Sequence, residues 1–305
     1  MVPSGPADDG LGVVDVGGSH LHAALVRDGD AGPELGERAA AALDADGDRE
    51  TLLDALAEPL DRLGASRWVV ALPGPFDYPA GRGDFAGVGK FAALSGVDLR
   101  QALAERLRVP GEHVQFLNDA VAYGLGEWWG TSGRPRRTVC ITLGTGVGSA
   151  FLVDGDPVAS GPGVPPHGWV HLLHLDGRPL EDAVSTRAVV AAYAARSGST
   201  LAVREIAALA RAGDPVATDV LTAAMRALGR ALRPSLADFD ADELVVGGSV
   251  SRSFDVLGPP LRAALALDGV RPLLVRPAVL LDDAPLLGAA WWFSRRRPGS
   301  PGRTP

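Results

Sequence analysis

The hydrophobic positions of the chain fall into short apolar runs that end at small turn residues. The run Leu11 to Val16 is followed by Gly17-Gly18 and then by a second run, residues 21–26. Short apolar runs separated by glycine are typical of buried strands joined by tight turns. The arrangement returns over 138–153, where two runs flank Gly144-Thr145-Gly146. This echo predicts two α/β lobes built on one plan.

The remaining apolar positions predict further helices and strands. Helical spacing of apolar residues predicts helices over 39–63, 99–107, 118–129, 185–236 with breaks near Gly198 and Gly213, 252–265 and 284–293. Short apolar runs predict strands over 68–72, 114–117 and 244–246, and ranges rich in glycine or proline predict loops over 76–96 and 160–166. The basic, Pro/Gly-rich tail over 295–305 is expected to be disordered.

Composition and charge exclude several classes of protein. The chain has 305 residues, 46% of them hydrophobic, which is enough for one large or two ordinary globular domains. The net charge of -8 argues against a nucleic-acid partner, because phosphate binding needs a basic face. No apolar run approaches the ~18 residues of a spanning helix, and the first ten residues lack the pattern of a signal peptide. We therefore expect a cytoplasmic protein without a membrane partner.

Three glycine turns are candidate phosphate sites, namely Gly17-Gly18-Ser19, Gly144-Thr145-Gly146 and Gly247-Gly248-Ser249. Glycine lets backbone N–H groups approach phosphate oxygens, although it is also the default residue of an ordinary turn. A P-loop ending at Gly89-Lys90 is excluded, because Asp84 and Phe91 stand where that motif needs Gly and Ser or Thr. A Rossmann turn at Gly144 is excluded because a strand pattern follows it, not a helix.

Two acidic positions follow predicted strands. Asp15 can hold a hydrated Mg²⁺ beside phosphates, or it can cap the turn that follows it. Asn118-Asp119 can cap the helix that begins there. The same pair can instead supply a sugar-binding amide beside a general base, which accepts a hydroxyl proton as that oxygen attacks phosphorus.

A metal site is the less favoured interpretation of the histidines after residue 160. His167, His171 and His174 have Glu181 and Asp182 nearby, but Pro165-Pro166 and Gly168 argue against a shared helical face. Cys140 is the only cysteine of the chain, so neither an intrachain disulfide nor a multi-cysteine zinc site can form. We favour a hydrogen-bonding role for these histidines and expect no zinc.

The motifs occur in an order that resembles the ROK family (repressors, open reading frames, kinases) of the sugar kinase, actin and Hsp70 superfamily. The resemblance runs over about residues 11–293. The matching motifs are Asp15-Val16-Gly17-Gly18-Ser19, Leu72-Pro73-Gly74-Pro75, Asn118-Asp119-Ala120, Leu143-Gly144-Thr145-Gly146-Val147-Gly148 and Val246-Gly247-Gly248-Ser249-Val250-Ser251.

The resemblance implies a two-lobed, actin-like (ribonuclease H-like) ATPase fold of the α/β class, with a cleft between the lobes. It implies a first lobe over 1–117, a second lobe over 118–283, a C-terminal helix over 284–297 that packs on the first lobe, and a disordered tail over 298–305. ROK repressors add an N-terminal helix-turn-helix segment. The first strand here begins near residue 11, so the kinase branch is favoured, and a homodimer is the expected assembly.

The resemblance also implies the roles of individual residues. Asp119 matches the catalytic base. ATP with Mg²⁺ would be bound by Gly17, Gly18, Ser19, Gly144, Thr145, Gly146, Gly247 and Gly248, with Asp15 holding Mg²⁺ through water. The sugar would contact Gly74, Lys90, Asn118, Asp119, His171 and Glu181.

Departures from the family pattern bear on the substrate. Typical members have Glu-x-Gly-His and then a three-cysteine zinc loop, whereas here Gly168 replaces the glutamate, His171 matches the histidine, and the zinc cysteines are missing. The runs Pro73 to Asp77 and Gly87 to Phe91 resemble zinc-less ROK kinases, some of which serve antibiotic biosynthesis and act on kanosamine or C7-cyclitols.

We therefore expect a phosphotransferase with an alcohol group as acceptor. The expected reaction is ATP-dependent phosphorylation of the primary 6-hydroxyl of a hexose or amino-hexose, with kanosamine as one candidate. The alternatives are a glucokinase, a C7-cyclitol kinase and, in another class, a non-catalytic sugar-sensing ROK protein. The acceptor, the phosphoryl donor, the pathway and the oligomeric state stay open at this point.

Overall fold

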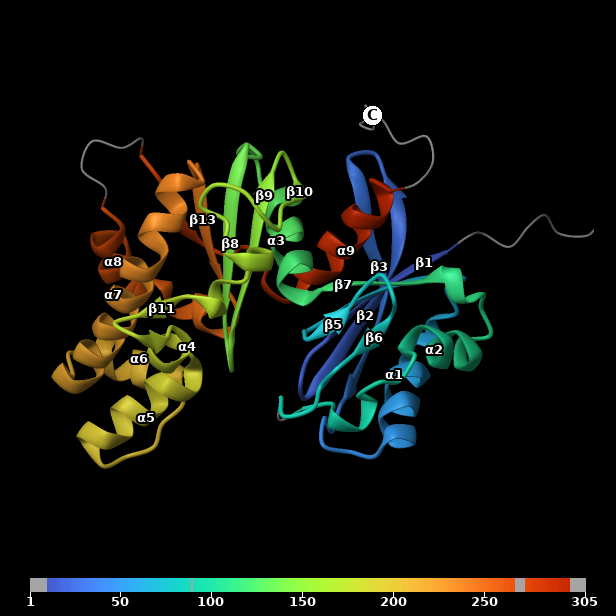
Figure 1. Ribbon diagram of the computed structural model, residues 1–305, viewed down its shortest axis with the longest axis horizontal. Helices are drawn as coiled ribbons and strands as arrows, with labels where there is room; N and C mark the ends of the chain where they lie inside the picture. Colours follow the sequence, from blue (N-terminus) through green and yellow to red (C-terminus); the bar gives the residue numbers. More distant parts are fainter. Residues whose placement is uncertain (1–9, 89, 267–271, 297–305) are drawn as a thin grey trace, which may run out of the picture. The chain divides into compact units, whose positions relative to one another are not determined.

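The computed structural model describes residues 10–88, 90–266 and 272–296 (Figure 1). The chain divides into two compact units, of which unit 1 comprises Met1–Gly126 and Asp282–Pro305 and unit 2 comprises Glu127–Leu281. In the part of the chain that the structure describes, no helix is long and apolar enough to cross a membrane.

Unit 1 is built on a five-stranded sheet of order β3-β2-β1-β4-β7. Its strands are β1 (Leu11–Val16), β2 (His20–Gly29), β3 (Gly32–Ala42), β4 (Arg67–Leu72) and β7 (Val114–Asn118). β1, β4 and β7 are parallel, and their register pairs Asp15 with Ala71 and Leu72 with Asn118. The carboxyl ends of the three parallel strands therefore meet at one edge of the sheet, where ligands of α/β folds bind.

Three helices, α1 (Arg49–Leu63), α2 (Leu99–Leu107) and α9 (Ala284–Ser294), pack against the sheet of unit 1, and α3 (Asp119–Trp129) follows β7 directly. Val14 and Val70 face the apolar cluster formed with α1 and α2. Side chains alternate along a strand, so Val13 and Val69 point to the opposite face of the sheet, where they are also fully buried. α9 packs against β1, β3 and β4. The smaller elements are β5 (Phe76–Asp77), β6 (Arg82–Gly83) and the 3₁₀ turns Ala92–Leu94, Gly111–His113 and Leu281–Asp283.

The predicted helix over 39–63 is wrong in its first part. Ala39 to Ala42 are good helix formers, but they pair with β2 as the end of the edge strand β3. α1 begins after Asp48, whose side chain accepts a hydrogen bond from the N–H of Thr51 and so caps the helix. Sheet pairing overrides the local propensity of the alanines.

The boundary between the units differs from the expected lobe boundary after residue 117. α3 and α9 lie so close that a Cβ on Gly126 would clash with the backbone of Ala284, and a Cβ on Gly288 would clash with the carbonyl of Ala122. This contact brings α9 and the first part of α3 into unit 1. Asn118 and Asp119 consequently belong to unit 1.

Unit 2 repeats the plan of unit 1 with a sheet of order β10-β9-β8-β13-β14. Its strands are β8 (Arg137–Leu143), β9 (Val147–Val153), β10 (Asp156–Pro157), β13 (Glu243–Gly247) and β14 (Leu274–Pro277). As in unit 1, an antiparallel pair adjoins parallel strands, here β8, β13 and β14. The strand–turn–strand echo in the sequence predicts this repetition, whereas the apolar pattern does not predict the short strand β14.

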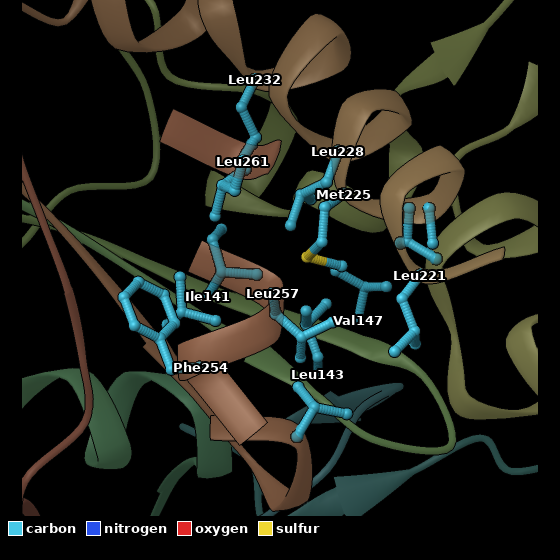
Figure 2. Packing of buried hydrophobic residues seen from close by; sticks show 14 of the residues in the cluster. Ile141, Leu143, Val147, Leu221, Met225, Leu228, Leu232, Phe254, Leu257 and Leu261 are labelled. Atoms are coloured by element: carbon cyan, nitrogen blue, oxygen red, sulfur yellow. The ribbon is translucent and has the colours of Figure 1, made fainter. Parts of the chain in front are cut away.

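The helices of unit 2 are α4 (Glu181–Val184), α5 (Thr186–Ser197), α6 (Val203–Arg211), α7 (Pro215–Asp238) and α8 (Phe254–Leu265). α7 and α8 share an apolar cluster with the sheet, and α4, α5 and α6 pack against α7. Figure 2 shows Leu228 of α7 and Leu257 of α8 packed with Ile141 of β8. The predicted breaks near Gly198 and Gly213 are confirmed, because Gly198 ends α5 in the left-handed conformation and Asp214 caps α7.

The segment between β10 and α4 contains only short elements. They are the 3₁₀ turns Pro166–Gly168 and Val170–Leu172 and the strands β11 (His174–Leu175) and β12 (Arg178–Pro179), and a further 3₁₀ turn, Ser249–Ser253, follows β13. The expected disordered tail over 298–305 lies outside the described residues.

Candidate active site

The end of β7 brings an amide and a carboxylate to the edge where the parallel strands of unit 1 end. Asn118 Oδ1 accepts a hydrogen bond from the N–H of Val121 at 3.1 Å, so Asn118 caps α3. Asp119 begins the helix, and its Oδ1 accepts from the N–H of Ala120 at 2.8 Å. The capping role that the sequence left open therefore falls to Asn118.

At this edge of unit 1, the carboxylates of Asp119 and Asp282 act on the buried carboxyl group of Asp15. Burial raises the pKa of Asp15 to about 7, and the negative charges of Asp119 and Asp282 add to that shift. Burial also raises the pKa of Asp119, while the N–H of Ala120 and the positive charge of Lys90 act against the increase. A cation bound beside Asp15 would offset the negative charges that raise its pKa.

We expect Asp15→Asn to stabilise the protein increasingly as pH rises from 5 to 8. Asp15 ionises near 7 in the folded chain and near 3.8 in the unfolded one, so the folded state binds more protons across this range. Stability from this group is therefore lost as pH rises, and asparagine abolishes the loss. The advantage in unfolding free energy should grow by about 2–3 kcal/mol between pH 5 and 8.

Urea unfolding of both proteins across that pH range measures this difference. Asp219→Asn, a change at an exposed ion pair with Arg196, is the matched control and should leave the difference from the parent constant. An advantage of Asp15→Asn that does not change with pH contradicts the pKa argument.

The first glycine turn joins β1 to β2. The N–H of Gly17 donates to the carbonyl of His20 at 2.9 Å, and the carbonyl of Ser19 accepts from the N–H of Leu43 at 2.9 Å. A Cβ on Gly18 would lie 3.7 Å from Cδ of Lys90. Lys90 therefore lies beside this turn, and its positive charge there lowers the pKa of Asp119. The predicted contact of Lys90 with the sugar stays a prediction.

Gly74 follows β4 and lies near a residue that the sequence analysis missed. A Cβ on Gly74 would lie 3.8 Å from Oη of Tyr78. The Tyr78 hydroxyl accepts a hydrogen bond from Nδ2 of Asn118 at 2.9 Å and donates to the carbonyl of Leu72 at 3.2 Å. The only signal in the sequence was the run Pro73 to Asp77, which ends immediately before Tyr78.

The second and third glycine turns lie together in unit 2. β8 and β13 are parallel neighbours that pair Thr142 with Gly247. Gly248 has a φ of 78°, and a Cβ there would clash with the backbone of Leu143, so glycine is required for this close approach. Within the described part of the chain, the N–H groups of Thr145 and Gly146 donate no backbone hydrogen bond.

Glu181 braces the second glycine turn. Its Oε1 accepts a hydrogen bond from the N–H of Val147 at 2.8 Å, and a Cβ on Gly146 would lie 2.8 Å from the same oxygen. The N–H of Thr186 donates to the carbonyl of Gly144 at 2.9 Å and fixes the other side of the turn. The predicted sugar contact of Glu181 stays a prediction, whereas its hydrogen bond to the turn is a role that the sequence did not reveal.

His171 lies in unit 2 beside an aromatic stack. The ring of Trp169 stacks on that of His171, with 5.5 Å between the ring centroids, and its centroid lies 4.8 Å from that of the His167 ring. Gly168 has a φ of 75°, and a Cβ there would lie 3.3 Å from the carbonyl of Val158, so the backbone disfavours a longer residue at this position. Among the described residues, no group of three or more His, Cys, Asp or Glu side chains forms a metal site.

A comparison with protein families identifies the chain. The model of the ROK family matches residues 11–296. The chain belongs to the ROK family. This result confirms the resemblance that the order of the glycine, Asn-Asp and proline motifs indicates.

Relatives of this ROK protein include two glucokinases. It is 28% identical to a glucokinase of Thermotoga maritima over 251 residues, which cover 72% of this chain and 77% of the relative. It is 27% identical to a glucokinase of Halalkalibacterium halodurans over 226 residues, which cover 63% of this chain and 66% of the relative. These relatives confirm the prediction of a phosphotransferase with an alcohol group as acceptor.

Solved structures confirm the two-lobed actin-like fold of the ROK protein. A ROK family glucokinase from Streptomyces griseus, solved in complex with glucose and AMPPNP, superimposes with a TM-score of 0.75 at 24% identity over 93% of this chain and 98% of the other. At that identity the likeness shows the fold alone. The expected homodimer, cytoplasmic location and individual site residues stay predictions.

We expect Glu181→Ala in the ROK protein to weaken nucleotide binding by at least about 5-fold, because the N–H of Val147 loses its acceptor and the turn loosens. Glu181→Gln keeps an oxygen at the same place and should bind within about 2-fold of the parent. Isothermal titration with a nonhydrolysable ATP analogue measures both values, and Asp182→Ala, at the exposed neighbouring position, is the control. Unchanged binding by Glu181→Ala would show that the brace has no effect on the turn.

Proposed function

We propose that this protein is an ATP-dependent sugar kinase that phosphorylates the primary 6-hydroxyl of a hexose or amino-hexose. The observation that carries the proposal is the position of Asp119, a partly buried carboxylate with a raised pKa at the start of α3, beside the Asn118 amide. A base whose pKa is raised towards the working pH accepts a proton more effectively. This is what phosphoryl transfer to an alcohol requires of the protein.

The residues present fit a nucleotide with Mg²⁺. The N–H groups of Thr145 and Gly146 suit phosphate oxygens, and the negative charges of Asp119 and Asp282 near Asp15 suit a hydrated cation. Asp15 would hold Mg²⁺ through water, and the Gly17 and Gly144 turns would hold the phosphates. When bound, the metal offsets charge on the phosphates.

The chain's own residues then have separate tasks. Asp119 takes the proton of the acceptor hydroxyl, and the adjacent Asn118 amide orients the acceptor. The positive charge of Lys90 keeps Asp119 more readily ionised than burial alone would allow. Gly74 and His171 complete the proposed acceptor contacts.

The backbone at Gly168 supports an acceptor other than glucose. Family members have a glutamate here, but in this chain the left-handed glycine packs against Val158, and its carbonyl accepts a hydrogen bond from the Ser149 hydroxyl at 2.6 Å. A substrate that needs the missing carboxylate loses about 1–3 kcal/mol of binding. We therefore propose that an amino-hexose such as kanosamine, or a C7-cyclitol of an antibiotic pathway, exceeds glucose in kcat/KM by at least about 10-fold.

A glucokinase is the second candidate, and the observation in its favour is the identity of 28% and 27% to two glucokinases. A panel of acceptors separates the two. It contains glucose, kanosamine, glucosamine, N-acetylglucosamine, mannose and a C7-cyclitol, with ATP or polyphosphate as donor. Coupled detection of ADP gives the rates, and ³¹P NMR of the product identifies the phosphorylated hydroxyl.

Each outcome of the panel has one meaning. Rapid turnover of an amino-hexose or cyclitol supports the proposal, and glucose as the best acceptor supports the glucokinase. Sugar binding in calorimetry without turnover of any acceptor overturns the kinase proposal in favour of a sugar sensor. A reaction mixture without acceptor measures ATP hydrolysis and is subtracted from every rate.

A further inference from the structure

The hydroxyl of Tyr78 lies between the Leu72 carbonyl, at 3.2 Å, and the Asn118 amide, at 2.9 Å. We propose that Tyr78 is a positioning residue of the acceptor site, which acts by holding the Asn118 side chain in one orientation. The inference rests on the proposed function, because Asn118 is an acceptor contact in that proposal. Tyr78 itself has no assigned role in the motifs that relate the chain to its family.

The hydrogen bonds admit only one direction of donation. At one end the backbone N–H of Val121 can only donate, so the Asn118 atom at 3.1 Å must be the amide oxygen. At the other end the carbonyl of Leu72 can only accept, so the Tyr78 hydroxyl donates to it. The hydroxyl oxygen is then an acceptor for Nδ2 of Asn118. Both backbone ends lie in regular structure, α3 and β4, so the amide cannot flip without breaking the chain of bonds.

The tyrosine ring is itself fixed by its surroundings. Its centroid lies 5.3 Å from that of Phe76. Arg100 donates from Nη2 to the carbonyl of Pro79 at 2.8 Å and from Nε to the carbonyl of Val114, in β7, at 3.1 Å. The loop that carries Tyr78 is therefore tied to the strand that carries Asn118, and the hydroxyl is a rigid support for the amide.

The hydroxyl stays protonated in this environment. Burial raises the pKa of Tyr78, and the nearby charge of Asp119 acts in the same direction. Tyr78 therefore does not serve as a proton acceptor in the reaction. Its contribution is geometric: it leaves one N–H and one oxygen lone pair of Asn118 pointing where a ligand oxygen can meet them.

The test is a double-mutant cycle in the acceptor assay with Tyr78→Phe, Asn118→Ala and the double variant. Tyr78→Phe should raise the acceptor KM by about 10-fold, because a misplaced contact loses much of its binding energy. The KM for ATP should stay within about 2-fold. In the Asn118→Ala background the same change should have less than about a 2-fold effect. Tyr193→Phe, at a buried tyrosine of unit 2, is the matched control and should leave both KM values unchanged.

The outcomes distinguish this inference from the proposed function. If the parent protein phosphorylates an acceptor and Tyr78→Phe has a normal acceptor KM, the positioning role is overturned while the function stands. If Tyr78→Phe raises the acceptor KM by the same factor in the parent and in the Asn118→Ala background, Tyr78 does not act through Asn118. A parent protein that phosphorylates no acceptor overturns the proposed function and, with it, the positioning role.

A second variant keeps the inference testable if Tyr78→Phe does not fold. Asn118→Asp keeps an oxygen for the N–H of Val121, but it removes the amide N–H that donates to the Tyr78 hydroxyl. We expect an acceptor KM about as high as that of Asn118→Ala. An acceptor KM equal to that of the parent would overturn the proposal.

Discussion

Asp119→Asn is expected to lower kcat by about 10²–10⁴-fold, the loss associated with removal of a general base. Asparagine has nearly the same shape, and its side-chain oxygen can still accept the hydrogen bond that Asp119 receives from the N–H of Ala120. Helix capping is unaffected, because Asn118 caps α3. The change therefore removes the proton acceptor and leaves the local structure in place.

A coupled assay with the best acceptor of the panel measures kcat, and calorimetry with a nonhydrolysable ATP analogue measures nucleotide affinity. We expect the affinity to stay within about 3-fold of the parent, since a base acts on the transition state and not on the bound nucleotide. Asp48→Asn makes the same chemical change at the N-cap of α1 and should leave kcat unchanged. If Asp119→Asn retains activity within a few-fold of the parent, Asp119 is not the base.

Arg276→Met should destabilise the protein by about 3–5 kcal/mol, the usual cost of leaving a buried charge without its partner. Arg276 donates to Glu127 at 2.8 Å and to Glu243 at 2.7 Å, and the side chains of both glutamates are at most 4% exposed. Methionine fills similar space but leaves two carboxylates buried without their counter-ion. Glu127 also accepts from the N–H groups of Val279 and Leu280, so the segment after β14 should loosen too.

Urea unfolding at pH 8 measures the effect, with Arg230→Met as the control. Arg230 pairs with Asp176 on the surface, where an ion pair contributes about 0–1 kcal/mol. A loss below about 1 kcal/mol at pH 8 would show that the network contributes little to stability.

The candidate site was predictable where its residues are close in the sequence. Asn118-Asp119 and the turns after Asp15 and after Leu143 are local motifs, and each lies at the carboxyl end of a strand, β7, β1 or β8. The residues that the sequence analysis missed act over long distances along the chain. Tyr78 bonds to a residue 40 positions away, and Glu127 bonds to Arg276 across 149 positions.

The sequence by itself determined the family, the α/β class and the two strand–turn–strand units, because turn chemistry and hydrophobic period act within a few residues. The tertiary structure decided that Ala39 to Ala42 form a strand, that Asn118 and not Asp119 caps α3, and that Glu181 supports a glycine turn. It also decided the raised pKa of Asp15, which depends on burial and on Asp119 and Asp282. These properties arise from contacts between distant segments, and such contacts exist only once strands pair and helices pack.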